Sequence, residues 1–130
     1  MQQRNTKQRA VIESIIETTA RPLTRAEIWE EAKKPLPSVG FATVSRAVND
    51  FLAEGRLIAL RYPGQPTRYE KLTNKEHPHL LSHKDGKIYD LDLPMPEVKI
   101  PKIPGVTITG YEVLFFGEPL EDDDTGGPEL

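Results

Sequence analysis

The sequence has no cysteine and no long hydrophobic run in its 130 residues. Without cysteine, disulfide bonds, thiolate metal sites and cysteine nucleophiles are excluded. No stretch is apolar enough to span a membrane, and no charged segment followed by an apolar one opens the chain. We therefore expect a soluble, cytoplasmic protein without a membrane partner. A chain of this length makes one or two small domains, whose modest cores need good packing or a partner subunit.

Charge is distributed unevenly along the chain, which carries a net charge of −3. Residues 1–72 contain 12 Lys and Arg against 8 Asp and Glu, a net charge of +4, whereas residues 73–130 contain 5 against 12, a net charge of −7. A basic front half is typical of a nucleic-acid-binding module joined to something else. The alternative is an ordinary acidic tail, because residues 118–129 supply six of the twelve acids.

One stretch, residues 40–55, has the pattern of an amphipathic helix. Its apolar positions follow helical spacing: Val44, Val48, Phe51 and Leu52. The other side carries short or hydrogen-bonding side chains: Ala42, Ser45, Arg46 and Asn49. Gly55 suits a left-handed cap at the end. Such a helix can enter the major groove of DNA, where Arg and Asn pair with base edges, although an ordinary core helix has the same apolar stripe.

The neighbouring segments predict a winged helix-turn-helix. A first helix is expected over about 6–18, and Thr24 opens a second helix, which starts with the capping box Thr24-x-x-Glu27 and ends before Pro35. After Gly55 the period changes, and residues 57–62 and 67–72 read as two strands of a hairpin. Three helices followed by a hairpin place the third helix in the major groove and the hairpin near phosphates. A winged helix that binds protein is the alternative.

Several motifs occur in a specific order and spacing. They are Thr6-Lys7-Gln8-Arg9, Leu23-Thr24-Arg25-Ala26-Glu27-Ile28, Gly40-Phe41-Ala42-Thr43-Val44-Ser45-Arg46-Ala47-Val48-Asn49, Arg68-Tyr69-Glu70, His77-Pro78-His79-Leu80 and Tyr111-Glu112-Val113-Leu114-Phe115-Phe116-Gly117. In these motifs the chain resembles the ferric uptake regulators over most of residues 6–117. The resemblance implies a homodimeric, metal-responsive transcription factor, most often a repressor, that binds double-stranded DNA at a palindromic operator.

The resemblance also implies an α+β fold with two domains. Residues 1–72 would form the winged-helix DNA-binding domain and residues 73–120 a small, mostly β dimerisation domain, and we expect the acidic tail, residues 121–130, to be disordered. Strands are expected over 87–93 and about 106–116. The segment 93–105 contains four prolines and cannot be a helix. The apolar run 113–116 would need cover from another subunit.

DNA-contacting residues follow from the winged helix and the motif matches. We expect contacts to bases or phosphates from Thr43, Ser45, Arg46 and Asn49. We expect contacts to the DNA backbone from Lys7, Arg9, Arg61 and Arg68. The family usually has a Tyr that contacts a base where this chain has Ser45, so a long aromatic side chain is replaced by a short one with a hydroxyl group.

The resemblance implies a regulatory metal site at the hinge between the domains, formed by Glu70, His77 and His79. A fourth family ligand, a His before the second helix, is Pro22 here, and His83 or Asp85 could complete the shell. We expect at most one divalent ion per subunit, zinc, manganese or iron. The thiolate zinc site of many members has no counterpart, because Ser82, Asp85, Pro119 and Asp122 stand where its two Cys pairs would be.

The second family site, which uses acids and a His, is also dismantled, since Pro78 replaces a carboxylate and Tyr111 stands near the expected His. A metal-independent regulator or protein-interaction module is therefore the alternative. We expect no enzymatic activity, because the sequence shows no converging acid, base or nucleophile. A hydrolase built on the three histidines would lack a general base and a cleft.

Overall fold

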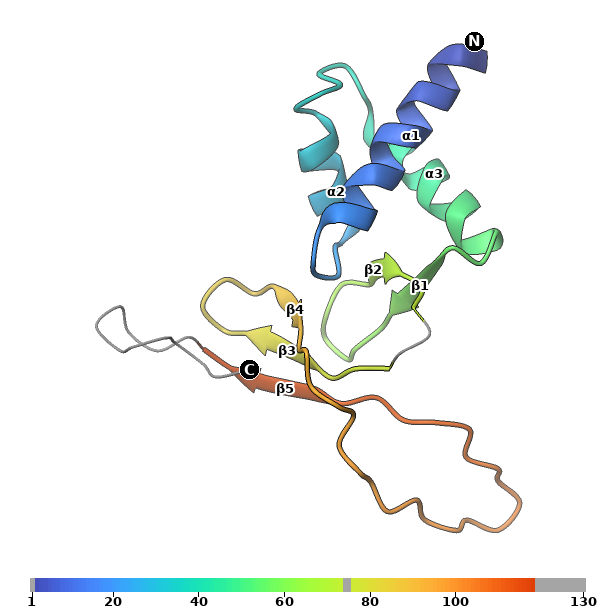
Figure 1. The fold of residues 1–130 in the computed structure, drawn as a ribbon, viewed down its shortest axis with the longest axis vertical. Coiled ribbons are helices and arrows are strands. Elements are labelled where there is room, and N and C mark those ends of the chain that lie inside the picture. The colour runs from blue at the N-terminus through green and yellow to red at the C-terminus, as the bar shows by residue number, and fades with distance from the viewer. Residues whose placement is uncertain (1, 74–75, 119–130) are drawn as a thin grey trace. The chain divides into compact units, whose positions relative to one another are not determined.

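A computed structural model describes residues 2–73 and 76–118, and the chain falls into two compact units, Met1–Asn74 and Lys75–Leu130. The first unit contains the helices α1 (Gln2–Thr18), α2 (Arg25–Ala32) and α3 (Phe41–Ala53) and the strands β1 (Leu57–Leu60) and β2 (Arg68–Lys71). The strands pair in antiparallel fashion as a hairpin that follows the three helices (Figure 1). The predicted winged helix is confirmed. α1 begins earlier than residue 6, where it was expected.

The core of the first unit joins all three helices and the hairpin. It includes the apolar positions of α3 together with side chains of the other elements: Ile12, Ile16, Leu23, Ile28, Val44, Val48, Phe51, Leu57 and Tyr69. The backbone of Leu23 exchanges two hydrogen bonds with Tyr69, of 2.9 and 2.8 Å, so the segment before α2 lies against β2 as a short extra strand. The hairpin is therefore held to the helices by both backbone and side-chain contacts.

Local signals fix the helix ends. At α2 both hydrogen bonds of the predicted capping box are present, between Thr24 and Glu27. At α3 the N-cap is Gly40, which offers no side-chain cap. Gly55 follows the helix with φ +72°, the left-handed conformation that its position predicted.

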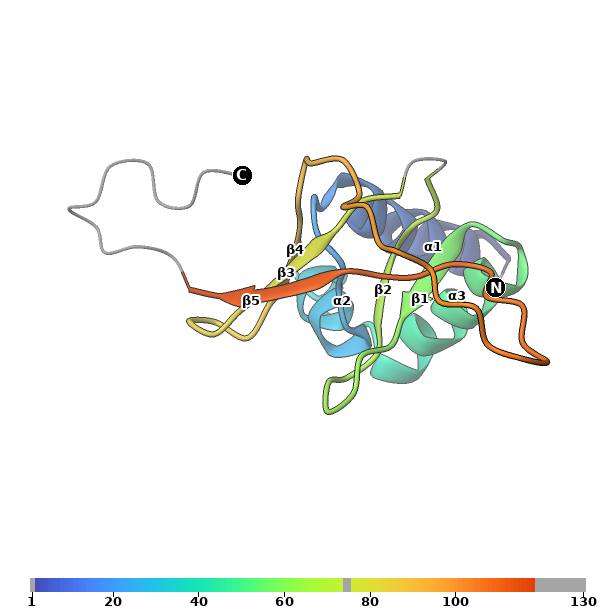
Figure 2. The same ribbon diagram turned by 90° about the horizontal axis from the view of Figure 1, so that it is seen from below.

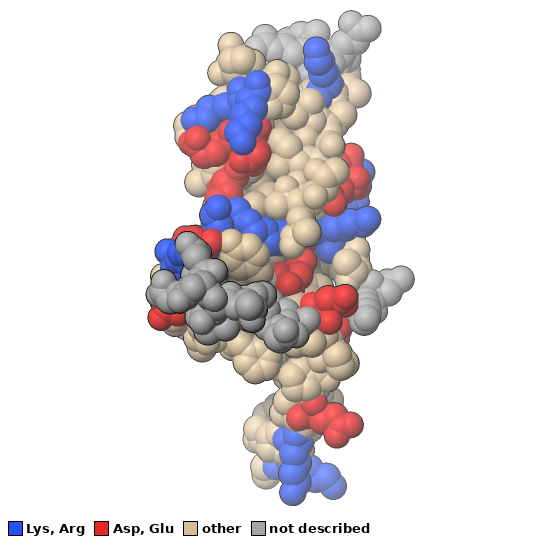
Figure 3. Space-filling view, turned by 60° about the vertical axis from the view of Figure 1, so that its left-hand side comes forward, with Lys and Arg blue, Asp and Glu red and all other residues tan. Residues whose placement is uncertain are grey.

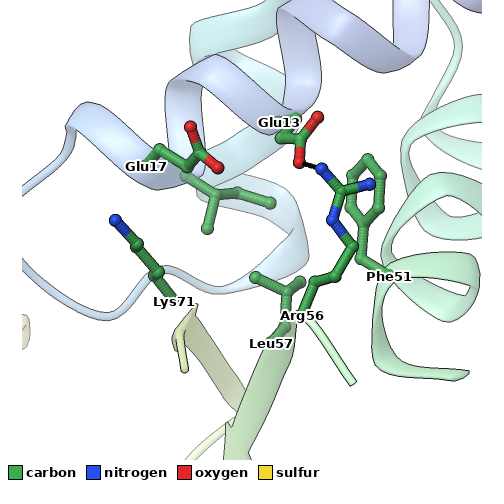
Figure 4. A pocket seen from close by; sticks show the side chains of 7 residues that line it. Glu13, Glu17, Phe51, Arg56, Leu57 and Lys71 are labelled. Carbon is green, nitrogen blue, oxygen red and sulfur yellow. Dashed lines mark ion pairs between the residues drawn. The ribbon is translucent and has the colours of Figure 1, made fainter. Parts of the chain in front are cut away.

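Charged side chains close the rim of this core. Arg56 pairs with Glu13 of α1 beside Phe51, and Glu17 and Lys71 lie at the other side of the same small hollow (Figure 4). Because these groups come from α1, from β2 and from the loop before β1, the rim ties the first helix to the hairpin.

The second unit is a three-stranded sheet of β3 (His79–Ser82), β4 (Ile88–Asp90) and β5 (Leu114–Gly117) in the order β4-β3-β5 (Figure 2). β3 is antiparallel to β4 and parallel to β5. The expected strands over 87–93 and 106–116 are too long. β3, which the sequence did not predict as a strand, is only four residues long, and its pairing with β5 is limited to residues 114–117.

The segment between β4 and β5, drawn in orange in Figure 1, contains neither helix nor strand over 91–113. Its prolines exclude a helix, as predicted. A single bridge joins Ile103 and Val106 around Gly105, whose φ is +78°. The expected disordered tail, 121–130, lies outside the described residues. The fold class is α+β, as predicted, and none of the described helices is both long and apolar enough to cross a membrane.

Candidate metal centre and DNA-binding helix

The helix α3 buries one side and exposes the other. Val44, Ala47, Val48 and Phe51 are buried, and this side fixes the helix on the core. On the other side Arg46 and Asn49 are exposed and Thr43 and Ser45 are half-buried. The predicted base-reading residues therefore lie on the solvent side of the helix, with small side chains that permit close approach.

Arg25, to which the sequence assigned no role, connects this side of α3 to the hairpin. Its Nη1 donates to the Ser45 backbone oxygen (2.9 Å) and to Ser45 Oγ (2.5 Å), and its Nη2 donates to Asn49 Oδ1 (2.8 Å). Its Nε donates to Tyr69 Oη (2.9 Å), and its Cζ lies 4.9 Å from the centre of the Tyr69 ring. Arg25 is the first residue of α2, and only the tertiary fold brings it to α3.

The four basic residues predicted on the DNA backbone have different surroundings. Lys7 and Arg61 are exposed. Arg9 instead pairs with Asp50 at 2.5 Å and Glu54 at 3.2 Å, so it holds α1 against α3.

Arg68 is only 4% exposed, and its Nη1 donates to Gln65 Oε1 at 3.1 Å. Burial lowers the pKa of its guanidinium, and the Glu27 carboxylate partly offsets this effect. A guanidinium this deeply buried is not presented to DNA, so the structure argues against the expected phosphate contact of Arg68.

The surface charge is mixed. On the face shown in Figure 3, Lys and Arg side chains lie beside Asp and Glu side chains and do not form one uninterrupted basic patch. Some cations in residues 1–72, such as Arg9, are ion-paired, so the net charge of +4 does not describe the charge that this domain offers to DNA. Individual exposed cations matter more for DNA binding than the sum.

Three potential metal ligands converge in the second unit. His77 Nε2 lies 3.2 Å and His79 Nε2 3.1 Å from Asp90 Oδ1, and the two imidazole rings are 4.6 Å apart. One ligand atom from each residue lies within 4.8 Å of the others. His79 is buried, whereas the side chain of Asp90 is 34% exposed. Two imidazole nitrogens and a carboxylate oxygen are a donor set that suits zinc, manganese or iron.

Asp90 was missed because it is distant in sequence from the histidines. It lies opposite His79 in the β3–β4 register, which no local pattern reveals. The two residues proposed to complete the shell lie elsewhere: His83 stacks on Phe116 with ring centres 6.1 Å apart, and Asp85 accepts hydrogen bonds from the Lys87 backbone (2.9 Å) and the Tyr89 hydroxyl (2.5 Å). Both are engaged in the β3–β4 turn and its surroundings.

Glu70, the third predicted ligand, lies on β2 in the first unit, opposite Ile58. Its part in a metal site stays a prediction.

Comparison with known proteins agrees with this architecture. A ferric uptake regulation protein from Rhizobium leguminosarum bv. viciae is 26% identical over 124 residues, which cover 93% of this chain and 87% of that protein. A zinc-bound manganese uptake regulator has a similar structure, with a TM-score of 0.69, 21% identity and coverage of 87% of this chain and 88% of that one.

The Helicobacter pylori ferric uptake regulator, described as having three functional metal binding sites, matches with a TM-score of 0.64 and 17% identity over 92% of this chain and 82% of that one. The sequence model of the ferric uptake regulator family matches residues 1–115. The chain therefore belongs to the ferric uptake regulator family of metal-responsive transcription regulators.

Proposed function

We propose that this protein is a homodimeric repressor that binds double-stranded DNA at a palindromic operator and is controlled by one divalent ion per subunit. The observation that carries the metal control is the convergence of His77, His79 and Asp90 on one small volume. Family membership supports the DNA-binding part.

DNA binding is assigned to α3 and to the exposed cations around it. Thr43, Ser45, Arg46 and Asn49 would face bases or phosphates, and Lys7 and Arg61 would contact the DNA backbone. We leave Arg9 and Arg68 out of this interface, because one is ion-paired within the domain and the other is buried.

The ion would be zinc, manganese or iron, held by His77, His79 and Asp90, with Glu70 proposed as a fourth ligand from the end of the hairpin. An ion bound to both Glu70 and the histidines would link the winged helix to the sheet. It would change DNA affinity only as far as it binds the DNA-competent arrangement more tightly than others.

Dimerisation is assigned to the proposed dimerisation domain, residues 73–120, through its sheet of β3, β4 and β5. Phe115 and Phe116 of β5 are 43% and 65% exposed. Exposed aromatic residues on an edge strand favour association, and a second copy of the chain would cover them.

The test combines metal analysis with DNA titration. Protein purified without chelator is analysed for bound metal, and mobility-shift titrations then compare manganese, zinc and chelator on duplexes selected from a randomised library. We expect metal to tighten binding and His79→Ala to abolish the response. His83→Ala is the matched control, because its imidazole stacks on Phe116 outside the cluster.

A metal-independent regulator is the second candidate. Asp90 already lies within hydrogen-bond distance of both imidazoles, so this cluster can stabilise β3 and β4 without an ion. This candidate predicts that neither metal nor chelator changes the DNA affinity and that His79→Ala lowers only the stability of the protein.

A further inference from the structure

Arg25 contacts the side of α3 that is proposed to face the DNA bases. It stands at the start of α2, and its side chain is partly buried beside Ser45, Asn49 and Tyr69. All four of its hydrogen-bond acceptors are neutral groups. None of these four acceptors balances its positive charge, which lies beside the proposed DNA-reading side of α3.

The chemistry of guanidinium decides the orientation of its partners. Arg has five N–H donors and no acceptor, so the Asn49 atom that faces it must be Oδ1 and not the amide nitrogen. The Asn49 amide NH₂ is then directed away from Arg25. Ser45 Oγ likewise accepts from Arg25, so its hydroxyl hydrogen is directed elsewhere. A short side chain at position 45 leaves room for the guanidinium to reach the backbone oxygen of Ser45.

With Asn49 held in this way, the polar groups that α3 offers outward at positions 46 and 49, the Arg46 guanidinium and the Asn49 amide, are hydrogen-bond donors. Guanine presents two acceptors, N7 and O6, in the major groove, whereas adenine presents one acceptor and one donor. Asn pairs with adenine through both its oxygen and its nitrogen, and Arg25 takes one of the two acceptor positions of that oxygen and holds it toward α2. The outward donors of Arg46 and Asn49 match the two acceptors of guanine better than the acceptor and donor of adenine.

We propose that Arg25 is a positioning residue that sets the base preference of α3, by holding Asn49 so that guanine is favoured over adenine at the base pair it faces. This inference rests on the proposed DNA-binding function. It assigns specificity to a residue that lies outside the third helix.

The experiment measures base preference as well as affinity. Manganese-loaded wild-type protein selects duplexes from a randomised library, and competition titrations compare the consensus duplex with its single-base variants. The base pair at which Asn49→Ala removes discrimination is the one that Asn49 faces. There, Arg25→Ala should reduce the preference for guanine over adenine by about tenfold or more, because the freed amide can pair with adenine.

Two further variants separate positioning from loss of charge or of fold. Arg61→Ala removes an exposed cation of the hairpin and should weaken binding to all duplexes while the base preference stays the same. Arg25→Lys keeps the charge but not the planar guanidinium that holds all four acceptors, so it too should lose discrimination, and it provides the test if Arg25→Ala does not fold.

The outcomes are distinct. If wild type selects guanine there and both Arg25 variants retain its preference, or if wild type selects adenine, the inference about Arg25 is wrong while DNA binding stands. If the metal-loaded wild type recovers no duplex from the library, the proposed function fails and the inference fails with it.

Discussion

At the scale of single residues, Glu27 shows how one carboxylate serves two contacts. It accepts the Thr24 backbone N–H at 2.9 Å and pairs with Arg21 at 3.1 Å. Burial alone would raise the pKa of Glu27, but the hydrogen bond from Thr24 and the Arg21 guanidinium outweigh it and lower the pKa. A group whose pKa is lowered by folding stabilises the protein above its ordinary pKa, and this stabilisation is lost as pH falls through the folded value.

We therefore expect Glu27→Gln to lower the free energy of unfolding by about 1 kcal/mol at neutral pH. The difference from wild type should shrink as pH falls below the ordinary Glu pKa of about 4.3 and then through the lower pKa of Glu27 in the folded protein, where the carboxylate becomes protonated. Urea unfolding at several pH values measures both effects. Glu30→Gln is the control on the same helix, because that side chain is 63% exposed and should change stability little. A difference for Glu27→Gln that persists at low pH would show that charge is not its cause.

At the scale of elements, α3 ends where it does because Gly55 can adopt a positive φ. The conformation at φ +72° is open to glycine and strained for residues with a Cβ. The turn that follows carries the chain from α3 into β1, so the placement of the hairpin depends on this residue.

Gly55→Ala should lower the free energy of unfolding by about 1 kcal/mol, through backbone strain alone. A Cβ at Gly55 would meet no heavy atom within 4 Å, and the same holds at Gly40, whose φ is −91°. Gly40→Ala is therefore the matched control, with a smaller expected effect. If chemical denaturation showed that Gly55→Ala and Gly40→Ala lower the free energy of unfolding equally, the role of the positive φ would be contradicted.

At the scale of the whole molecule, the proposed dimer depends on the apolar side of β5. Phe116→Glu should weaken self-association, because it places a charge where the second copy would bury an aromatic ring. Sedimentation at several micromolar concentrations measures the change. Phe41→Glu is the control, since Phe41 is 42% exposed but lies at the start of α3. A wild-type protein that is monomeric at these concentrations would remove the dimer proposal.

Metal binding, also a property of the whole molecule, should depend on pH. Ligating histidines must be deprotonated, so zinc affinity should fall as pH is lowered from about 7 to about 5. Zinc titrations of wild type and of His83→Ala should show the same pH dependence, because His83 is outside the cluster. An affinity that does not change with pH would argue against imidazole ligands.

Much of the first unit follows from local sequence. The period of Val44, Val48 and Phe51 defines the buried side of α3, and Thr24, Glu27 and Gly55 mark helix ends by backbone chemistry that acts within a few residues. The spacing of two between His77 and His79 predicts that both imidazoles lie on one side of the chain, and their rings lie 4.6 Å apart where the chain enters β3. Such signals are visible in sequence because their partners are near neighbours along the chain.

Contacts between distant residues were decided only by the tertiary structure. The register of β3 and β4 brings Asp90 to His79, and the packing of α2 against α3 brings Arg25 to Ser45 and Asn49. The burial of Arg68 and the pairing of Arg9 have the same origin. Composition and periodicity indicate which side of an element is buried, whereas the identity of the residue across the contact depends on strand register and helix packing, which no local pattern contains.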